Sequence, residues 1–137
     1  VVFGAPEKLK NHENQAVKCS LKMKEELNKL NTIWDEKETS RFWKNHGIES
    51  ITMRIGLHTG SVIAGNIGSQ EMLQYTTIGD TVNVAARLEQ ANKEYGTDIS
   101  FSSEIYTALT KELYEKAKLS GEIMLKGRGT STKVYSI

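Results

Sequence analysis

Apolar residues recur with a helical period in the first third of the chain. From residue 16 onward they stand three, four or seven positions apart, at Ala16, Met23, Leu27, Leu30 and Trp34. This spacing places them on one face of an amphipathic helix whose outer face is rich in lysine. Asn11 can accept hydrogen bonds from the free N–H groups of a first turn, so we expect it to be the N-cap.

The next residues, 35–47, carry many charges and show no clear period. We expect a connecting segment that is partly helical, with the rings of Phe42 and Trp43 packed against the body of the protein.

Two further helices are predicted in the second half of the chain. Apolar residues at intervals of four, three and four form a second stripe, at Val84, Leu88, Ala91 and Tyr95. We expect Asp80 to cap the start of this helix and Gly96 to end it. A shorter helix is expected to begin at Ser102 or Ser103 and to reach about residue 113.

Strands are indicated where apolar residues alternate with others or where β-branched residues gather. Residues 51–58 alternate, and residues 62–64 can pair back onto them across a turn at 59–61. Further strands are expected at residues 73–78 and 98–101.

The two ends of the chain also have the composition of strands. Residues 121–125 and 133–137 are expected to form a hairpin around 127–129, and residues 1–3 the end of a buried strand. The resulting order of strands and helices favours an α+β fold, in which helices pack on one face of a sheet. A length of 137 residues favours a single domain spanning 1–137.

Composition excludes several classes of partner. Eighteen Lys and Arg residues against seventeen Asp and Glu residues leave a formal net charge of +1, so we expect no nucleic-acid partner. The single cysteine, Cys19, cannot form an internal disulfide, which favours a reducing compartment. Because no apolar run approaches the roughly 20 residues of a membrane span, we expect a cytoplasmic domain. Val1 opens an apolar run without an initiator methionine, so we expect the domain to be truncated at its N-terminus.

The candidate chemistry lies in the predicted helix after Gly79. Asn83 and Arg87 are four positions apart, so they share one helix face within its first two turns. Free N–H groups and the positive end of the helix dipole favour an anion there, and a guanidinium suits phosphate oxygens. Spacing alone is more typical of an exposed polar face with a surface arginine, so it permits a phosphate site without requiring one.

The surrounding motif resembles a known signature. The segment Gly79-Asp80-Thr81-Val82-Asn83-Val84-Ala85-Ala86-Arg87 is similar to that of the class III nucleotidyl cyclases, the adenylate and guanylate cyclase catalytic domain. Further landmarks follow in family order: residues 2–6, 54–60, 64–68 and 125–127. The resemblance covers essentially the whole chain and implies a ferredoxin-like class III cyclase fold that lacks its N-terminal strand, helices and metal-site hairpin.

The resemblance also implies roles for individual residues. Asn83 would orient the ribose and Arg87 would neutralise charge as the 3'-hydroxyl of ATP attacks the α-phosphate. Thr76 takes the position that reads the purine edge, and Thr77 beside it is expected to contact substrate. Threonine at position 76 is typical of bacterial adenylate cyclases. Lys126 would approach the terminal phosphates, with Arg128 as the alternative.

Two other polar residues have simpler interpretations. We expect Asp80 to cap the helix rather than bind metal. We expect His58 to be a hydrogen-bonded strand histidine, because no nucleophile and carboxylate accompany it in a recognisable motif.

The family's reaction uses Mg²⁺ or Mn²⁺, whose aspartate ligands would precede residue 2, so no metal ligand is assigned in this chain. The family also implies a homodimer with active sites at the interface, and an upstream regulatory or sensor domain. We therefore expect the parent protein to be an adenylate cyclase and this chain alone to be inactive. Guanylate cyclase activity, or a non-catalytic domain for dimerisation or nucleotide sensing, remains the alternative.

Overall fold

The structure is a computed structural model that describes residues 1–69, 72–125 and 130–137. Its helices are α1 (His12–Glu36), α2 (Arg41–Lys44), α3 (Asp80–Tyr95), α4 (Ser103–Ala108) and α5 (Lys111–Lys116). Its strands are β1 (Ile55–Leu57), β2 (Ile63–Ser69), β3 (Met72–Ile78), β4 (Ile99–Ser102), β5 (Lys118–Leu125) and β6 (Thr130–Ser136). The α+β class expected from the order of elements is confirmed.

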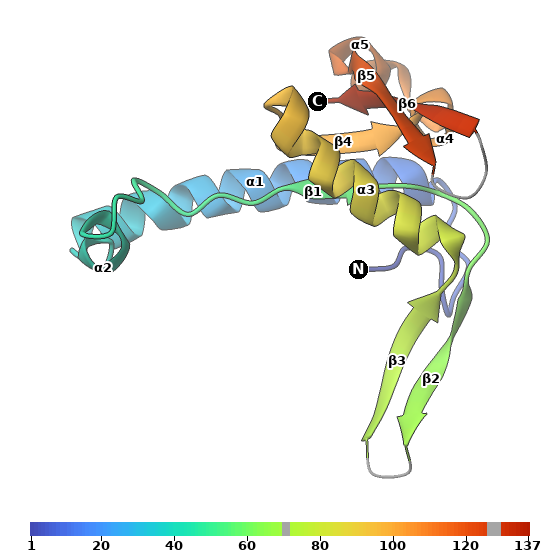
Figure 1. Cartoon of the computed structure of the whole chain (residues 1–137), viewed down its shortest axis with the longest axis horizontal. Coiled ribbons are helices and arrows are strands. Elements are labelled where there is room, and N and C mark those ends of the chain that lie inside the picture. The colour runs from blue at the N-terminus through green and yellow to red at the C-terminus, as the bar shows by residue number, and fades with distance from the viewer. Residues whose placement is uncertain (70–71, 126–129) are drawn as a thin grey trace.

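The strands form two separate sheets. Four of them make a sheet in the order β1-β4-β6-β5, in which β1 is parallel to β4 and the other pairs are antiparallel. The other two, β2 and β3, form an antiparallel hairpin that extends away from the body of the molecule (Figure 1). The predicted hairpin at the C-terminal end of the chain is confirmed in its pairing, since β5 pairs with β6. The turn between these two strands lies outside the described residues.

Helices cover both faces of the larger sheet. On one face, Ile99 and Phe101 of β4 pack with residues of α1, α4 and α5. On the other, Val84 and Leu88 of α3 pack against Val134 of β6. The expectation of helices on one face was wrong, because all four residues of β4 are buried and both sides of the strand therefore require a covering layer.

One predicted strand pairing and one predicted strand differ in the structure. Residues 62–64 do not pair back onto residues 51–58, since β2 pairs with β3 and β1 pairs with β4. The carbonyl of Ser61 accepts a hydrogen bond from the Thr81 hydroxyl at 2.8 Å, which directs the chain toward α3. Residues 1–3 form no strand, and Val1 is fully exposed, so a buried strand end there was also wrong.

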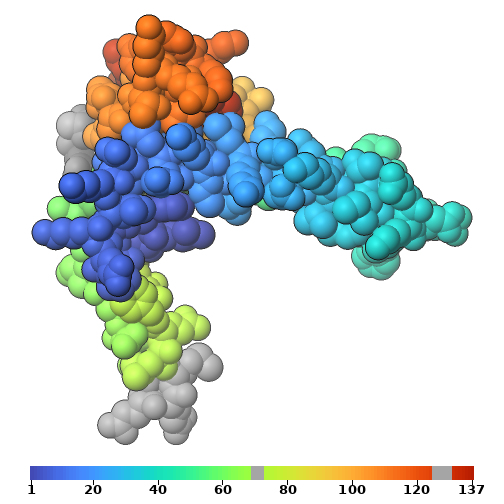
Figure 2. All heavy atoms as spheres, turned by 180° about the vertical axis from the view of Figure 1, so that it is seen from behind, coloured from blue at the N-terminus to red at the C-terminus, as the bar shows by residue number. Residues whose placement is uncertain are grey.

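Helix α1 extends well beyond the sheet. Its buried residues, Asn14, Ala16, Val17 and Ser20, all lie in its first half. Beyond Ser20, Met23 and Leu30 are each 42% exposed, and Figure 2 shows the far end of the helix standing out from the body together with α2. Its N-cap, Asn11, has a φ of 57° and makes no side-chain cap bond, so the predicted cap residue is right and the predicted bond is absent.

The segment around α2 contains one packed and one exposed aromatic ring. Trp43 lies edge-on to Trp34 of α1, with ring centroids 5.5 Å apart. Phe42 is 76% exposed, and Trp43 packs on the outer end of α1, so neither ring packs against the body as expected.

The predicted helix of residues 102–113 is two helices. Leu109 and Thr110 have extended backbones, with ψ of 144° and 155°, and separate α4 from α5. Ser102 is the N-cap of α4, but its side chain makes no cap bond, because its hydroxyl is hydrogen-bonded to His58. No helix in the described residues is both long and apolar enough to cross a bilayer.

We predict that Phe101→Ala lowers the free energy of unfolding by about 3 to 5 kcal/mol, because it leaves a cavity in the main core. The matched control is Phe42→Ala, since the Phe42 ring is 76% exposed and its loss is expected to cost less than about 0.5 kcal/mol. Urea denaturation followed by circular dichroism measures both. Equal losses would contradict the assignment of this core.

Candidate functional site

Helix α3 lies directly on the backbone of β1, and the contact requires a glycine. A Cβ at Gly56 would overlap with the carbonyl oxygen of Ala85 and the amide nitrogen of Glu89 in α3. Any larger residue would push the helix off the strand. The distance between α3 and the sheet therefore depends on the absence of a side chain at position 56.

The C-terminal end of α3 is held by Asn92, which is 1% exposed. Its side-chain amide donates to the Ile55 carbonyl of β1 at 3.0 Å. Its Oδ1 accepts from the hydroxyls of Thr97 at 2.7 Å and Ser100 at 2.5 Å. These bonds satisfy a buried amide and join the helix to β1 and β4 at once.

The N-terminal turn of α3 begins after Gly79, whose φ of 153° is accessible mainly to glycine. Asp80 is the first helical residue rather than the N-cap, which corrects the predicted capping role. Its carboxylate nevertheless lies in the first turn, where the helix dipole stabilises negative charge.

Asn83 and Arg87 lie in the first two turns of α3, as their spacing predicts. The Asn83 side chain is exposed and Arg87 is half-buried. The guanidinium donates from Nη1 to the carbonyl of Met124 in β5 at 3.1 Å. Farther along the same helix, the Tyr95 hydroxyl donates to the carbonyl of Glu122 in β5 at 3.0 Å. Arg87 thus lies against the edge strand β5.

The structure does not bring all the predicted site residues together. Thr76 and Thr77 lie in β3, where they pair with Gly65 and Ala64 of β2. Within the described ranges, no hydrogen bond joins either threonine to Asn83 or Arg87. Lys126 and its alternative Arg128 lie outside the described residues.

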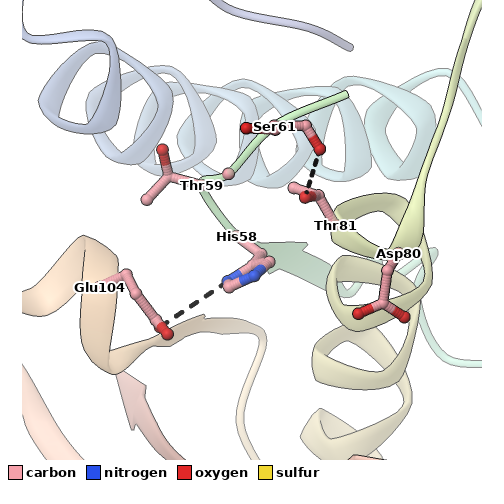
Figure 3. Close-up of a pocket in the computed structure, with 7 residues that line it drawn as sticks. His58, Thr59, Ser61, Asp80, Thr81 and Glu104 are labelled. Atoms are coloured by element: carbon pink, nitrogen blue, oxygen red, sulfur yellow. Dashed lines mark hydrogen bonds and ion pairs between the residues drawn. The ribbon is translucent and has the colours of Figure 1, made fainter. Parts of the chain in front are cut away.

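A cavity of about 330 Å³ opens beside the first turn of α3. It is bounded by the residues that follow β1 and by the start of α4, as Figure 3 shows. His58 lies in it with its Nδ1 2.7 Å from the Ser102 hydroxyl and 3.8 Å from a carboxylate oxygen of Glu104. The expectation that His58 is hydrogen-bonded is confirmed, one position beyond the end of β1.

Sequence reasoning missed the cluster of His58, Ser102 and Glu104 because His58 is more than 40 positions from the other two and shares no motif with them. Burial raises the pKa of the Glu104 carboxyl. Hydrogen bonds from Ser102 and from its own backbone N–H, together with the charge of a protonated His58, outweigh burial and leave the pKa of Glu104 below its ordinary value.

The described part of the chain supplies no metal site. No three His, Cys, Asp or Glu side chains in residues 1–69, 72–125 and 130–137 lie close enough together to hold an ion. These described residues therefore do not form a catalytic metal site by themselves.

Comparison with known proteins finds one family. The sequence model described as "Adenylate and Guanylate cyclase catalytic domain" matches residues 1–137. Adenylate cyclase 1 of Rhizobium meliloti is 35% identical over 136 residues, which are 99% of this chain and 19% of that protein. The receptor-type guanylate cyclase gcy-28 of Caenorhabditis elegans is 33% identical over 135 residues, 98% of this chain and 10% of that protein.

Solved structures agree in fold. The guanylyl cyclase Cya2 matches with a TM-score of 0.72 and 27% identity, covering 98% of this chain and 61% of its own. The adenylyl cyclase CyaB from P. aeruginosa matches with a TM-score of 0.65 and 26% identity, covering 98% and 63%. The chain thus has the fold of these catalytic domains and spans a fifth or less of the two relatives named above.

We predict that Gly56→Ala lowers the free energy of unfolding by about 1 to 3 kcal/mol, because its Cβ would overlap with the backbone of α3. Gly65→Ala is the matched control, since a Cβ there meets nothing within 4 Å. It is expected to be neutral or slightly stabilising. Thermal and urea denaturation measure both variants, and a Gly56→Ala chain as stable as its Gly65→Ala counterpart would contradict the close contact.

Proposed function

Because the chain belongs to the adenylate and guanylate cyclase catalytic domain family, we propose that it supplies the ribose- and phosphate-binding face of an adenylate cyclase. The observation that carries this proposal is the placement of Asn83 and Arg87 in the first two turns of α3. Helix N-terminal turns bind anions through free N–H groups and the dipole, and the guanidinium adds a permanent positive charge.

The proposed reaction is an intramolecular phosphoryl transfer. The 3'-hydroxyl of ATP loses its proton and attacks the α-phosphorus, a new P–O bond closes the cyclic ester, and pyrophosphate leaves. The Asn83 amide, which can donate and accept, orients the ribose. Arg87 neutralises charge that develops on the phosphate oxygens, and donors of this kind contribute about 100-fold to 1,000-fold in rate.

The present position of Arg87 is compatible with this role. In the described part of the chain, the guanidinium makes a single hydrogen bond, to the Met124 carbonyl, so one of its five N–H donors is used. That bond limits the rotamers of a long side chain, which reduces the entropy lost when a phosphate binds. Lys126 follows Met124 by two positions, and we assign it to the terminal phosphates on the resemblance of its motif.

We assign Thr76 to the purine edge, with Thr77 beside it. The threonine hydroxyl can accept a hydrogen bond from the adenine amino group, which favours ATP. It can also donate, so it discriminates weakly against guanine. Guanylate cyclase activity is the second candidate, and the similarity to gcy-28 and Cya2 favours it.

Catalysis in this family generally involves divalent metal, and Mg²⁺ or Mn²⁺ would supply charge neutralisation and activation of the attacking hydroxyl. Among the described residues, no three His, Cys, Asp or Glu side chains lie close enough together to hold such an ion. We infer that the chain alone binds nucleotide with negligible turnover.

We also propose that the protein acts as a homodimer through the β2–β3 hairpin. Several large apolar side chains of the hairpin are more than half exposed, namely Ile63, Leu73 and Ile78 at 74%, 62% and 53%. An extended hairpin with apolar side chains of this size on its surface favours association, because their burial removes apolar area from water.

We predict that Arg87→Ala weakens ATP binding by about tenfold, because a charge-assisted hydrogen bond to phosphate is lost. Isothermal titration calorimetry at low salt measures the affinity. The control is Arg41→Ala, since Arg41 lies on the exposed helix α2, away from α3, and forms an ion pair with Glu38. Equal affinities for all three chains would contradict the assignment.

Turnover of ATP with Mn²⁺ is expected to be no higher in the unmodified chain than in Arg87→Ala.

We predict that Ile63→Lys shifts the chain toward monomer, because it places a charge in the proposed apolar interface. Sedimentation velocity is expected to show a dissociation constant raised by about tenfold or more. Leu119→Lys, at a residue of β5 that is 60% exposed, is the matched control and is expected to leave association unchanged. A similar effect of both substitutions would argue against the hairpin as the interface.

A further inference from the structure

The cavity beside α3 joins three elements that are distant in the sequence. It lies where the chain leaves β1, where α3 begins and where α4 begins (Figure 3). His58 comes from the first of these, Asp80 and Thr81 from the second, and Glu104 from the third. All of its lining side chains are polar. A change of charge in the cavity therefore acts on the three elements through hydrogen bonds and charge–charge contacts.

His58 is the titratable group at the centre of this junction. Its side chain is 12% exposed, and its Nδ1 contacts the fully buried Ser102 hydroxyl and faces the Glu104 carboxylate. Among the described residues lining the cavity, the other titratable groups are Glu104 from α4 and Asp80 from α3, while β4 presents only the Ser102 hydroxyl. Both carboxylates favour a positive charge on the ring.

A short run of backbone connects His58 to the first turn of α3. Three residues later, the Ser61 carbonyl accepts the Thr81 hydroxyl at 2.8 Å. Between them, a Cβ at Gly60 would lie 2.7 Å from the same hydroxyl oxygen, so this loop and the first turn of α3 are in close contact. Thr81 stands two positions before Asn83. A shift of the loop at 59–61 therefore moves the turn that carries Asn83.

We propose that His58 is a pH-sensitive positioning residue for α3. Protonation of its ring strengthens the attraction to Glu104, draws the end of β1 toward α4, and fixes the loop at 59–61 against the first turn of α3. Histidine is the side chain whose ordinary change of charge falls between about pH 5 and 8. The lowered pKa of Glu104 keeps that carboxylate charged throughout this interval. An effect of His58 protonation on nucleotide binding rests on the proposed role of Asn83.

The test is a pH titration of the full 137-residue chain by two-dimensional NMR between pH 5.5 and 8, without nucleotide. We expect the backbone amides of Ser61, Thr81 and Asn83 to follow one titration curve, with the midpoint of the His58 ring protons. His58→Gln is expected to abolish that curve. His12→Gln and His46→Gln remove the other two histidines of the chain and are expected to leave it unchanged.

Glu104→Gln is the second variant, and it keeps the proposal falsifiable if His58→Gln does not fold. Loss of the carboxylate is expected to shift the titration midpoint of the His58 ring to lower pH by about half a unit. This is the effect expected from the loss of one half-exposed ion pair. A curve that persists in His58→Gln, or a midpoint unmoved in Glu104→Gln, would overturn the proposal. Since no nucleotide is present, failure of the proposed cyclase role would leave this result unaffected.

Discussion

The contact between α3 and β1 determines where the proposed catalytic side chains lie. Gly56 lets the helix backbone approach the strand backbone, and Asn92 fixes the far end of the helix through bonds to two strands. A helix held by a close contact and by a buried amide has little freedom to slide or rotate. The orientation of Asn83 and Arg87 depends on these two contacts, although neither residue makes them.

Local patterns predicted α3 almost to the residue, because its apolar stripe, Gly79 and Gly96 are all encoded within 18 positions. The terminal hairpin was predictable for the same reason. The parallel pairing of β1 with β4 was not, since the two strands are separated by the hairpin and α3. The strand expected at residues 1–3 failed because apolar composition indicates burial only where a neighbour covers it.

The candidate site likewise contains residues that local patterns predict and contacts that they do not predict. The shared face of Asn83 and Arg87 follows from helical spacing, whereas the Met124 carbonyl that holds Arg87 lies 37 positions away and carries no side-chain signal. The roles of Thr76, Thr77 and Lys126 came from resemblance to a family rather than from spacing. Ser102 illustrates the limit of cap rules, because a hydroxyl suited to cap α4 binds His58 instead.

The exposed edges of the two sheets differ in how they can associate. At one edge of the larger sheet, Arg87 and Tyr95 of α3 already bind the carbonyls of Met124 and Glu122, so strand addition to β5 would have to displace both. The β2–β3 hairpin extends away from the helices (Figure 1), and several of its exposed side chains are large and apolar, among them Ile63, Leu73 and Ile78. Association through the hairpin leaves α3 and its bonds to β5 intact. Self-association is therefore compatible with an accessible Arg87 when it uses the hairpin, and it competes with Arg87 when it uses β5.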